Sequence, residues 1–465
     1  MFATPLLLLF PLPAFQEAAK APEPKGPVIV FQVDLIEPLE GDPIPNGTLL
    51  VRDGVIEKMG QGLVVPKGAE VHDLRGPGSS LLPPLVLAHG DFLQRDSRGR
   101  GRYGRFRASD SLYLDEEDLP RLRKQGILLV GIDPPGTGIP GRTSVYTVEG
   151  AAPRPDALVG DLYLKMTLQR NASSKKLLRS VIKDAEKAIE KEKKAREEWE
   201  KARKEWEEKQ KARAEKEKKE KKEDQAGDKG GEKGKDPRSA EGEDGGKEEG
   251  KKEKEEKAPP EKFVPPKIDP DLLPVVEWLR KERVVQIWLN GAATWLHWKD
   301  LLGDRDLPFE TVLSFSRFSN SHDYEEVLEK MAKASLWIYV PSRLTFLPQT
   351  RNRINLPADL VAAGGSLILE PPYPDWKGVE AWRQGVADLV RAGLDRTAAL
   401  KAMTLEPAAA LGQEEILQAL KPGAPATFMV LGGDPLDPTA KVDFLVREGR
   451  ILFDREKTER KEQER

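Results

Sequence analysis

The feature that most constrains the fold is a long charged segment in the middle of the chain. Residues 207–262 contain no aromatic residue and no Val, Ile, Leu or Met. Such a stretch cannot bury enough apolar surface to offset the entropy lost on folding, so it is expected to be disordered. The residues before it, from about 173, carry Glu and Lys at i,i+4 spacing and predict one long solvated helix. The core must therefore come from the sequence on either side.

A weak heptad pattern along this helix leaves a coiled coil as an alternative. Its seam would contain Val181, Ala188, Ala195 and Ala202, with Trp199 and Trp206 at a second position. Because most of the seam is alanine or charged, a single helix is the better interpretation.

Both flanks of the charged segment alternate between apolar strands and amphipathic helices. The strand-like runs include GILLVGID (126–133), ERVVQIWLNG (282–291) and GGSLILEPP (364–372), and GVEAWRQGVADLVRAG is a clear helix. This alternation indicates an α/β fold with a parallel sheet, either a barrel or a doubly wound sheet. The chain ends differ, because residues 28–76 alternate with a period of two around a hairpin signal at Asp53-Gly54, and strand signals return after residue 426.

Composition excludes several kinds of chemistry. The 465 residues include no cysteine, which excludes disulfides, thiolate metal sites and a cysteine nucleophile, and only four histidines. The net charge of −3 does not call for a nucleic-acid or membrane partner. Residues 1–20 resemble a secretory signal peptide and predict export. No segment is long and apolar enough to predict a transmembrane helix in the mature chain.

Two glycine-containing motifs could bind anionic groups. GTGIPGR, from Gly136, matches a dinucleotide-binding pattern, but the strand-like TSVYTV follows where a helix is needed, which favours a plain loop and no nucleotide cofactor. The segment 95–107, RDSRGRGRYGRFR, contains six arginines and predicts either an anion site, with Arg100, Arg102 and Arg105 as candidates, or a solvated surface loop. The acidic overall balance argues against nucleic acid as the partner.

A histidine and an aspartate end the apolar run LLPPLVLAHGDF (81–92). Side chains at i and i+2 of a strand point to the same face, so His89 and Asp91 could converge on one ion or one substrate. Equally, they could be two polar residues at the solvated end of a strand.

Four stretches together resemble the amidohydrolase superfamily, in particular its imidazolonepropionase-like branch. They are NGTLLVRDGVIEKMG, AEVHDLRGPGSSLLPPLVLAHGDF, AMTLEPAAALG and the run from Lys421 to Asp454. The resemblance implies a distorted (β/α)8 (TIM) barrel from 81–172 and 263–419 and a small composite β-sandwich from 27–80 and 420–456. The charged helical and disordered insert 173–262 and a charged tail 457–465 lie outside both. The resemblance also implies metal-dependent hydrolysis of cyclic amide C–N bonds.

The resemblance further implies where metal ligands should lie. The family has a His-x-His pair after the first barrel strand, histidines at the fifth and sixth strands and an aspartate at the eighth. In this sequence those positions fall on His89 and Asp91, then on Trp288, Asn320 and Pro372. His322, Glu370 and Asp375 are near enough in sequence to be recruited as substitute ligands. The other two histidines, His72 and His297, are expected to be packed or surface residues.

Because a catalytic zinc takes three protein ligands, these replacements predict a degenerate site without a cofactor. The predicted role is then the binding of a small molecule, or scaffolding. One alternative is an active hydrolase with a rebuilt single zinc site on His89 and Asp91. Another is a polyanion-binding protein that uses the arginines of 95–107.

Overall fold

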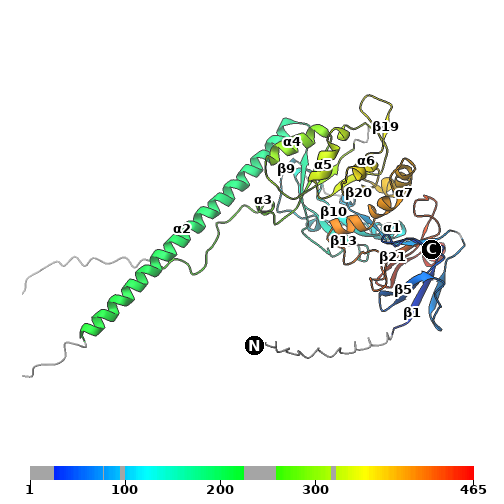
Figure 1. Cartoon of the computed structure of the whole chain (residues 1–465), viewed down its shortest axis with the longest axis horizontal. Helices are drawn as coiled ribbons and strands as arrows, with labels where there is room; N and C mark the ends of the chain where they lie inside the picture. The colour runs from blue at the N-terminus through cyan, green and yellow to red at the C-terminus, as the bar shows by residue number, and fades with distance from the viewer. Residues whose placement is uncertain (1–25, 77, 95–99, 225–257, 316–320, 465) are drawn as a thin grey trace, which may run out of the picture.

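The computed structural model describes residues 26–76, 78–94, 100–224, 258–315 and 321–464. The expected signal peptide, Arg95, Arg98 and Asn320 lie outside these residues. The chain is a mixed α/β protein, as predicted (Figure 1). The sheets that contain β1, β5 and β21 lie together at one end, next to the C-terminus, and helices α4 to α7 surround the other end (Figure 1).

Two sheets built from both ends of the chain share one apolar core. The first has the order β5-β4-β1-β6 and the second the order β23-β22-β21-β7-β2-β3. Their bounds are β1 (Val28–Gln32), β2 (Leu35–Ile36), β3 (Ile44–Pro45), β4 (Gly47–Arg52), β5 (Val55–Gln61), β6 (Glu70–Asp73), β7 (Ser80–Leu82), β21 (Phe428–Leu431), β22 (Val442–Arg447) and β23 (Arg450–Asp454). Phe31 packs edge-on against Phe428, with ring centroids 4.9 Å apart, which joins the two ends. His72 stacks on Phe31 at 4.9 Å and is a packed residue.

The hairpin between β4 and β5 turns where the sequence predicts. Asp53 and Gly54 both have positive φ, 50° and 79°. Two successive positive φ angles are the requirement of a tight two-residue hairpin turn, and Asp-Gly meets it with little strain.

The larger part of the molecule contains a mainly parallel sheet and a smaller sheet beside it. The large sheet has the order β12 (Gly141–Arg142), β14 (Leu164–Leu168), β15 (Val285–Leu289), β16 (Phe309–Leu313), β17 (Ile338–Pro341) and β20 (Leu367–Glu370), parallel from β14 onward. The smaller sheet has the order β13 (Ser144–Thr147), β10 (Ile127–Ile132) and β8 (Leu85–Leu87). Two short pairs complete the strands: β9 (Arg100–Arg102) with β11 (Thr137–Ile139), and β18 (Thr345–Phe346) with β19 (Arg353–Ile354). Within the described residues no ladder joins β8 to β20, so strand pairing alone does not close a barrel.

The helices of the described residues cover these sheets. They are α1 (Asp118–Lys124), α2 (Ala172–Asp224), α3 (Leu273–Leu279), α4 (Ala292–Leu302), α5 (Leu328–Ala334), α6 (Leu356–Ala362), α7 (Trp376–Arg391), α8 (Arg396–Lys401), α9 (Leu405–Ala410) and α10 (Arg455–Gln463). Most of the predicted charged tail is therefore helix α10. No helix among the described residues is long and apolar enough to cross a membrane.

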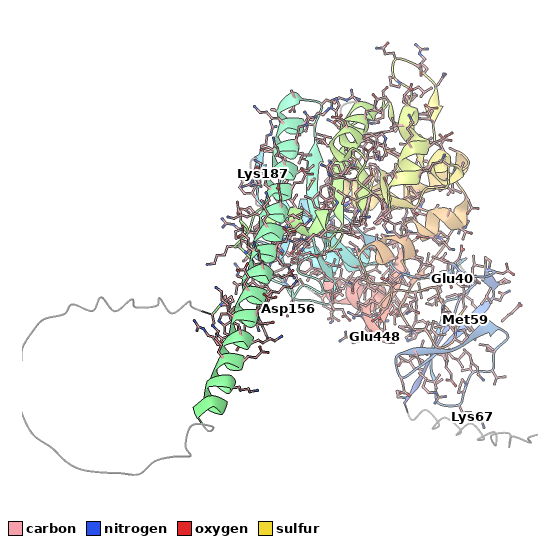
Figure 2. The ribbon with its side chains drawn as sticks, turned by 60° about the vertical axis from the view of Figure 1, so that its left-hand side comes forward. Glu40, Met59, Lys67, Asp156, Lys187 and Glu448 are labelled. Carbon is pink, nitrogen blue, oxygen red and sulfur yellow. The ribbon has the colours of Figure 1, made fainter. Side chains whose placement is uncertain are left out.

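Helix α2 corrects the boundary drawn for the charged insert. Its first turns bury Leu178, Val181, Ile182 and Ala185 in the same core as the parallel strands, so they belong to the body of the molecule. Further along, Trp199 lies against Phe263, with ring centroids 5.9 Å apart. Beyond Trp206 the described side chains are exposed, and the helix extends past the body (Figures 1 and 2). The apolar side chains of the first turns and Trp199 thus pack on the chain itself, and no large apolar residue follows Trp206 in the helix.

Candidate functional site

A row of polar side chains crosses three neighbouring parallel strands. Lys165 of β14 is the register partner of Gln286 of β15, which is in turn the partner of Glu310 of β16. All three are buried, with 1–3% of their surface exposed. Because side chains at matching register point to the same face, the row presents an ammonium, an amide and a carboxyl group to one interior space.

His89 meets this row from the end of β8. Its Nε2 lies 3.0 Å from Oε1 of Gln286 and 3.6 Å from Oδ2 of Asp133, which follows β10. Its Nδ1 lies 3.2 Å from Oε1 of Glu370, at the end of β20. Gln286 Oε1 also accepts a hydrogen bond from the indole of Trp288, at 3.2 Å, which identifies it as the amide oxygen. Nε2 therefore has a hydrogen-bond acceptor in Gln286, whereas Nδ1 faces the Glu370 carboxylate in an ion-pair contact without a hydrogen bond.

The charge on His89 follows from these neighbours. Burial by itself would lower the pKa of His89, but the carboxylates of Glu370, Asp133 and Asp91 outweigh it and raise the pKa to about 9. The ring is then an imidazolium at neutral pH, with a proton on each nitrogen.

Lys165 supplies a second positive charge beside the carboxylates. Its Nζ lies 3.7 Å from Oδ2 of Asp133 and 3.9 Å from Oδ2 of Asp91, and 4.0 Å from the centre of the Trp288 ring. Burial raises the pKa of Asp91, and Lys165 opposes that rise. Asp91 Oδ1, Asp133 Oδ2 and Glu370 Oε1 make no hydrogen bond with a described residue, so the two protein cations are their nearest electrostatic partners.

Glu310 ends the row inside a second hydrogen-bonded group. The hydroxyl of Tyr339, on β17, donates to Oε2 of Glu310 at 2.6 Å, and Gln286 Nε2 approaches the same oxygen at 3.5 Å. Burial raises the pKa of Glu310 to about 7, although these hydrogen bonds oppose the rise. The site therefore contains an acid that titrates near neutral pH.

A small cavity of about 100 Å³ opens above His89. Its floor contains His89, Asp91 and Glu370, and its walls include the aromatic side chains of Phe92, Trp288, Phe315, Tyr339 and Tyr373. Such a cavity suits a small, mainly apolar group that hydrogen-bonds at its base.

The structure brings together only part of the predicted ligand set. Glu370, rather than Pro372, occupies the end of β20 and contacts His89, while Pro372 lines the cavity wall. On β15 the residue that contacts His89 is Gln286, while Trp288 lines the cavity wall. Asn320 lies outside the described residues, and β16 contributes Glu310 to the row. Asp375 instead caps α7 by accepting a hydrogen bond from the Gly378 amide.

His322 is also separate from the cavity floor. Its ring stacks on Phe315, with centroids 4.1 Å apart, and burial together with nearby Arg343 lowers its pKa to about 4. The remaining histidine, His297, is carried by α4.

Five residues of the site were not predicted from the sequence: Asp133, Lys165, Gln286, Glu310 and Tyr339. A usable signal was present, because Lys165, Gln286 and Glu310 are each the one charged or amide residue in a mainly apolar strand, in LYLKMTL, VVQIWL and FETVL. Such a residue in a buried strand needs a partner, and here the partners lie on other strands and on the segments that follow them.

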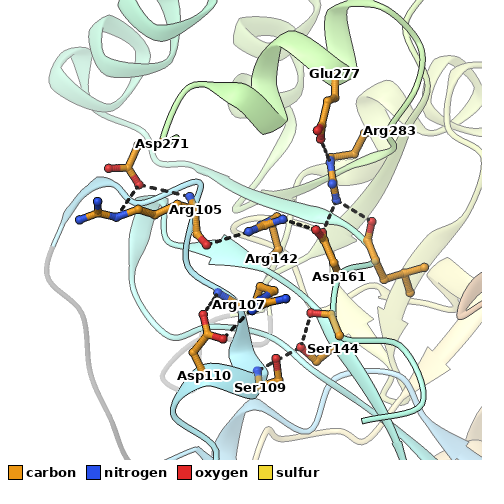
Figure 3. Close-up of polar contacts among 12 residues, drawn as sticks. Arg105, Arg107, Ser109, Asp110, Arg142, Ser144, Asp161, Asp271, Glu277 and Arg283 are labelled. Carbon is orange, nitrogen blue, oxygen red and sulfur yellow. Dashed lines mark hydrogen bonds and ion pairs between the residues drawn. The ribbon is translucent and has the colours of Figure 1, made fainter. Parts of the chain in front are cut away.

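The described arginines of the 95–107 segment have partners within the chain, and their role in anion binding stays a prediction. Arg102 pairs with Asp269 at 2.9 Å and with Asp184 of α2 at 3.6 Å, and Arg105 lies 3.7 Å from Asp271. Arg100 donates to the hydroxyl of Ser173 at 2.6 Å. Figure 3 shows Arg105 beside Asp271 and, as a separate pair, Arg107 beside Asp110. The backbone carbonyl of Arg105 accepts a hydrogen bond from Arg142, which pairs with Asp161, and Asp161 in turn pairs with Arg283. These contacts fasten the chain on both sides of the charged insert to the body.

Comparison with known proteins supports the fold assignment. No protein-family model and no curated protein sequence matches the chain. Among solved structures, an amidohydrolase from Thermotoga maritima matches with a TM-score of 0.63 and 19% identity, over 92% of this chain and 100% of that one. The chain has an amidohydrolase fold. Ochratoxinase from A. niger (14% identity) and a zinc-bound adenosine deaminase from Xanthomonas campestris (10% identity) match with TM-scores of 0.46, each over 92% of this chain and over 96% and 93% of their own lengths.

The amidohydrolase fold raises the question of whether these residues suit a divalent metal. A zinc ion needs neutral imidazole nitrogen and carboxylate oxygens that converge on one point. Here both nitrogens of His89 face protein oxygens, and Lys165 lies beside Asp91 and Asp133. Among the described residues, no three His, Asp or Glu side chains are grouped so as to hold a metal ion. The residues as arranged do not fit the metal.

Proposed function

We propose that this chain is a metal-independent binding protein built on an amidohydrolase fold. The observation that carries the proposal is the position of both His89 nitrogens against protein oxygens: Nε2 is hydrogen-bonded to Gln286, and Nδ1 makes an ion-pair contact with Glu370 at 3.2 Å. In this arrangement the imidazolium and the Lys165 ammonium provide the positive charge that a metal ion would otherwise bring to the carboxylates. The alternative of a rebuilt zinc site on His89 and Asp91 would require His89 to lose a proton and leave one partner.

The cavity indicates what kind of molecule would bind. Aromatic walls favour a small ring or alkyl group, and the floor offers imidazolium and carboxylate groups for hydrogen bonds. The ligand would therefore be small and largely apolar, with one polar group directed at His89. A cavity of about 100 Å³ has room for only part of a larger molecule, so the remainder would project outward.

Three finer features remain inferences of the same kind. We infer that the large parallel sheet (β12 to β20) and the smaller sheet of β13, β10 and β8 together form a distorted (β/α)8 barrel. The reason is that His89, after β8, lies 3.2 Å from Glu370 at the end of β20. The similarity to the imidazolonepropionase-like branch stays a prediction. Export is proposed from the composition of residues 1–20 alone.

Metal content after zinc loading tests the proposal. The purified protein is incubated with excess zinc, passed through gel filtration and analysed by elemental mass spectrometry. We expect well under one equivalent of zinc in the wild type. The double variant Asp91→His with Gln286→His, which replaces two neighbours of His89 with neutral donors, is expected to retain more and so serves as a positive control. One equivalent in the wild type that is lost in His89→Ala would overturn the proposal and favour a rebuilt metal site.

Ligand binding to the cavity is tested separately. A library of small aromatic and alkyl compounds is screened by ligand-observed NMR against the wild type and Val312→Phe, since Val312 lines the cavity and a larger side chain would fill it. Hits that bind the wild type and not the filled variant support the proposal. Equal binding to both proteins would place the ligand elsewhere.

A further inference from the structure

A second, larger recess lies beside the cavity and has a different chemistry. It has a volume of about 580 Å³ and lies between the segment after β17, the β18–β19 pair and the second half of α7. Pro372 lines both spaces, so the two are neighbours. We call it the arginine recess, because Arg343, Arg353 and Arg391 are on its lining.

The charge of the arginine recess is positive. Asp388 is its one acidic lining residue, against three arginines, which leaves a net charge of +2. Asp388 is already engaged, by Arg391 at 2.8 Å and by Gln384 at 2.9 Å. Arg353 packs over the Phe346 ring at 5.7 Å and makes no ion pair with another described residue. The Arg353 guanidinium, which contacts an aromatic ring and no carboxylate of the described residues, retains its capacity to bind an oxyanion.

A buried hydroxyl provides a second, independent indication. Ser342 is fully buried and lines the arginine recess, and its Oγ makes no hydrogen bond with any described residue. Helix α7 packs closely against Ser342. A Cβ added to Gly385 would lie only 2.2 Å from the Ser342 carbonyl oxygen. A buried donor without an acceptor costs stability, so a ligand that accepts its hydrogen bond would recover that cost.

The position of Arg343 connects the two spaces. Its guanidinium lies 5.2 Å from the ring centres of both Phe315 and Tyr373, which are walls of the cavity above His89. Contact with two rings restrains the side chain at the boundary between cavity and recess.

We propose that the arginine recess binds a doubly charged oxyanion, the phosphate group of a small phosphate monoester. A phosphate monoester carries a charge close to −2 at neutral pH, which matches the net charge of the recess. Its three terminal oxygens offer acceptors for the guanidinium groups and for the Ser342 hydroxyl that line the recess. A carboxylate brings a single negative charge and would leave half of the positive charge uncompensated.

Phosphate titrations test this inference and do not depend on the cavity above His89. Binding of inorganic phosphate to the full chain is measured by isothermal calorimetry at low salt, with acetate as the singly charged comparison. We expect saturable phosphate binding, weaker acetate binding, and a loss of about tenfold for each of Arg353→Gln, Arg391→Gln and Ser342→Ala. Arg351→Gln is the matched control, because Arg351 is two residues from Arg353 and does not line the recess.

Three results would overturn the proposal. The first is an equal phosphate affinity in Arg351→Gln and Arg353→Gln. The others are an acetate affinity as high as the phosphate affinity and a wild type that shows no saturation at millimolar phosphate. Because Ser342→Ala removes only one oxygen, an affinity loss in that variant with an unchanged unfolding midpoint would show that the effect arises at the site and not from misfolding.

Discussion

The charge on His89 predicts how the stability of the protein depends on pH. The pKa of His89 rises from 6.5 to about 9 in the folded protein. At about 1.4 kcal/mol for each pH unit, that difference contributes about 3 kcal/mol to the free energy of unfolding. A group with a raised folded pKa binds more protons in the folded state. Its contribution is therefore fully present below pH 6.5 and is lost as the pH rises through 9.

Two other buried groups titrate at lower pH and can be separated from His89. The raised pKa of Glu310, about 7, lowers stability as the pH rises from 4.5 to 7. The lowered pKa of His322, about 4, raises stability between 4 and 6.5. Above pH 7 the effect of His322 is complete and about 0.4 kcal/mol of the Glu310 effect remains, so His89 dominates the window between about pH 7 and pH 9.5.

The assay is urea unfolding across this window, for the wild type and for His89→Gln. Glutamine keeps a side chain that can hydrogen-bond but cannot titrate. We expect the difference in unfolding free energy between wild type and variant to shrink by about 2.5 kcal/mol from pH 7 to pH 9.5, because part of the contribution is already lost at pH 7. Parallel pH profiles for the two proteins would refute the assignment of an imidazolium. An NMR titration of the four histidine rings, in which the resonance missing from His89→Gln shows a pKa at or below 6.5, would do the same.

The remaining predictions concern the core of the site and the long helix. Tyr339→Phe removes the donor to Glu310 and should lower the free energy of unfolding in urea by about 1–3 kcal/mol. The control Tyr373→Phe, at the half-exposed cavity rim, should change that free energy by under about 0.5 kcal/mol. Equal losses in the two variants would show that the hydrogen bond to Glu310 is unimportant. Deletion of residues 209–257 with a flexible linker should leave the thermal midpoint within about 2 °C of the wild type, because the described part of α2 is exposed beyond Trp206. Trp199→Ala, in contrast, should lower the thermal midpoint by a few degrees through the loss of its packing on Phe263. A deletion that lowers the midpoint more than Trp199→Ala does would show that residues 209–257 contribute to the stability of the body.

Much of the fold could be predicted from local sequence. The hairpin at Asp53-Gly54, the parallel strands that flank the insert and the strands at both chain ends follow from a period of two, from turn residues and from apolar runs. The boundary of the insert could not be set so precisely. Four apolar residues in the first turns of α2, Leu178, Val181, Ile182 and Ala185, are spread among charged ones, and only the surface they contact shows that they are core.

The candidate site divides in the same way. Local sequence predicted that His89 follows a buried apolar strand, because a run of apolar residues is a property of a few neighbouring positions. The expected strand alternation does not reach Asp91, since β8 ends at Leu87 and Asp91 begins a 3-10 turn. The residues that meet His89 could not be predicted in this way. Gln286 and Glu370 are far from it in sequence, and they arrive there through the register of strands β14 to β20, which is fixed by backbone hydrogen bonds and packing between distant segments. The same holds for the arginines of 95–107, since local sequence shows their charge and the folded chain alone places Asp184, Asp269 and Asp271 beside them.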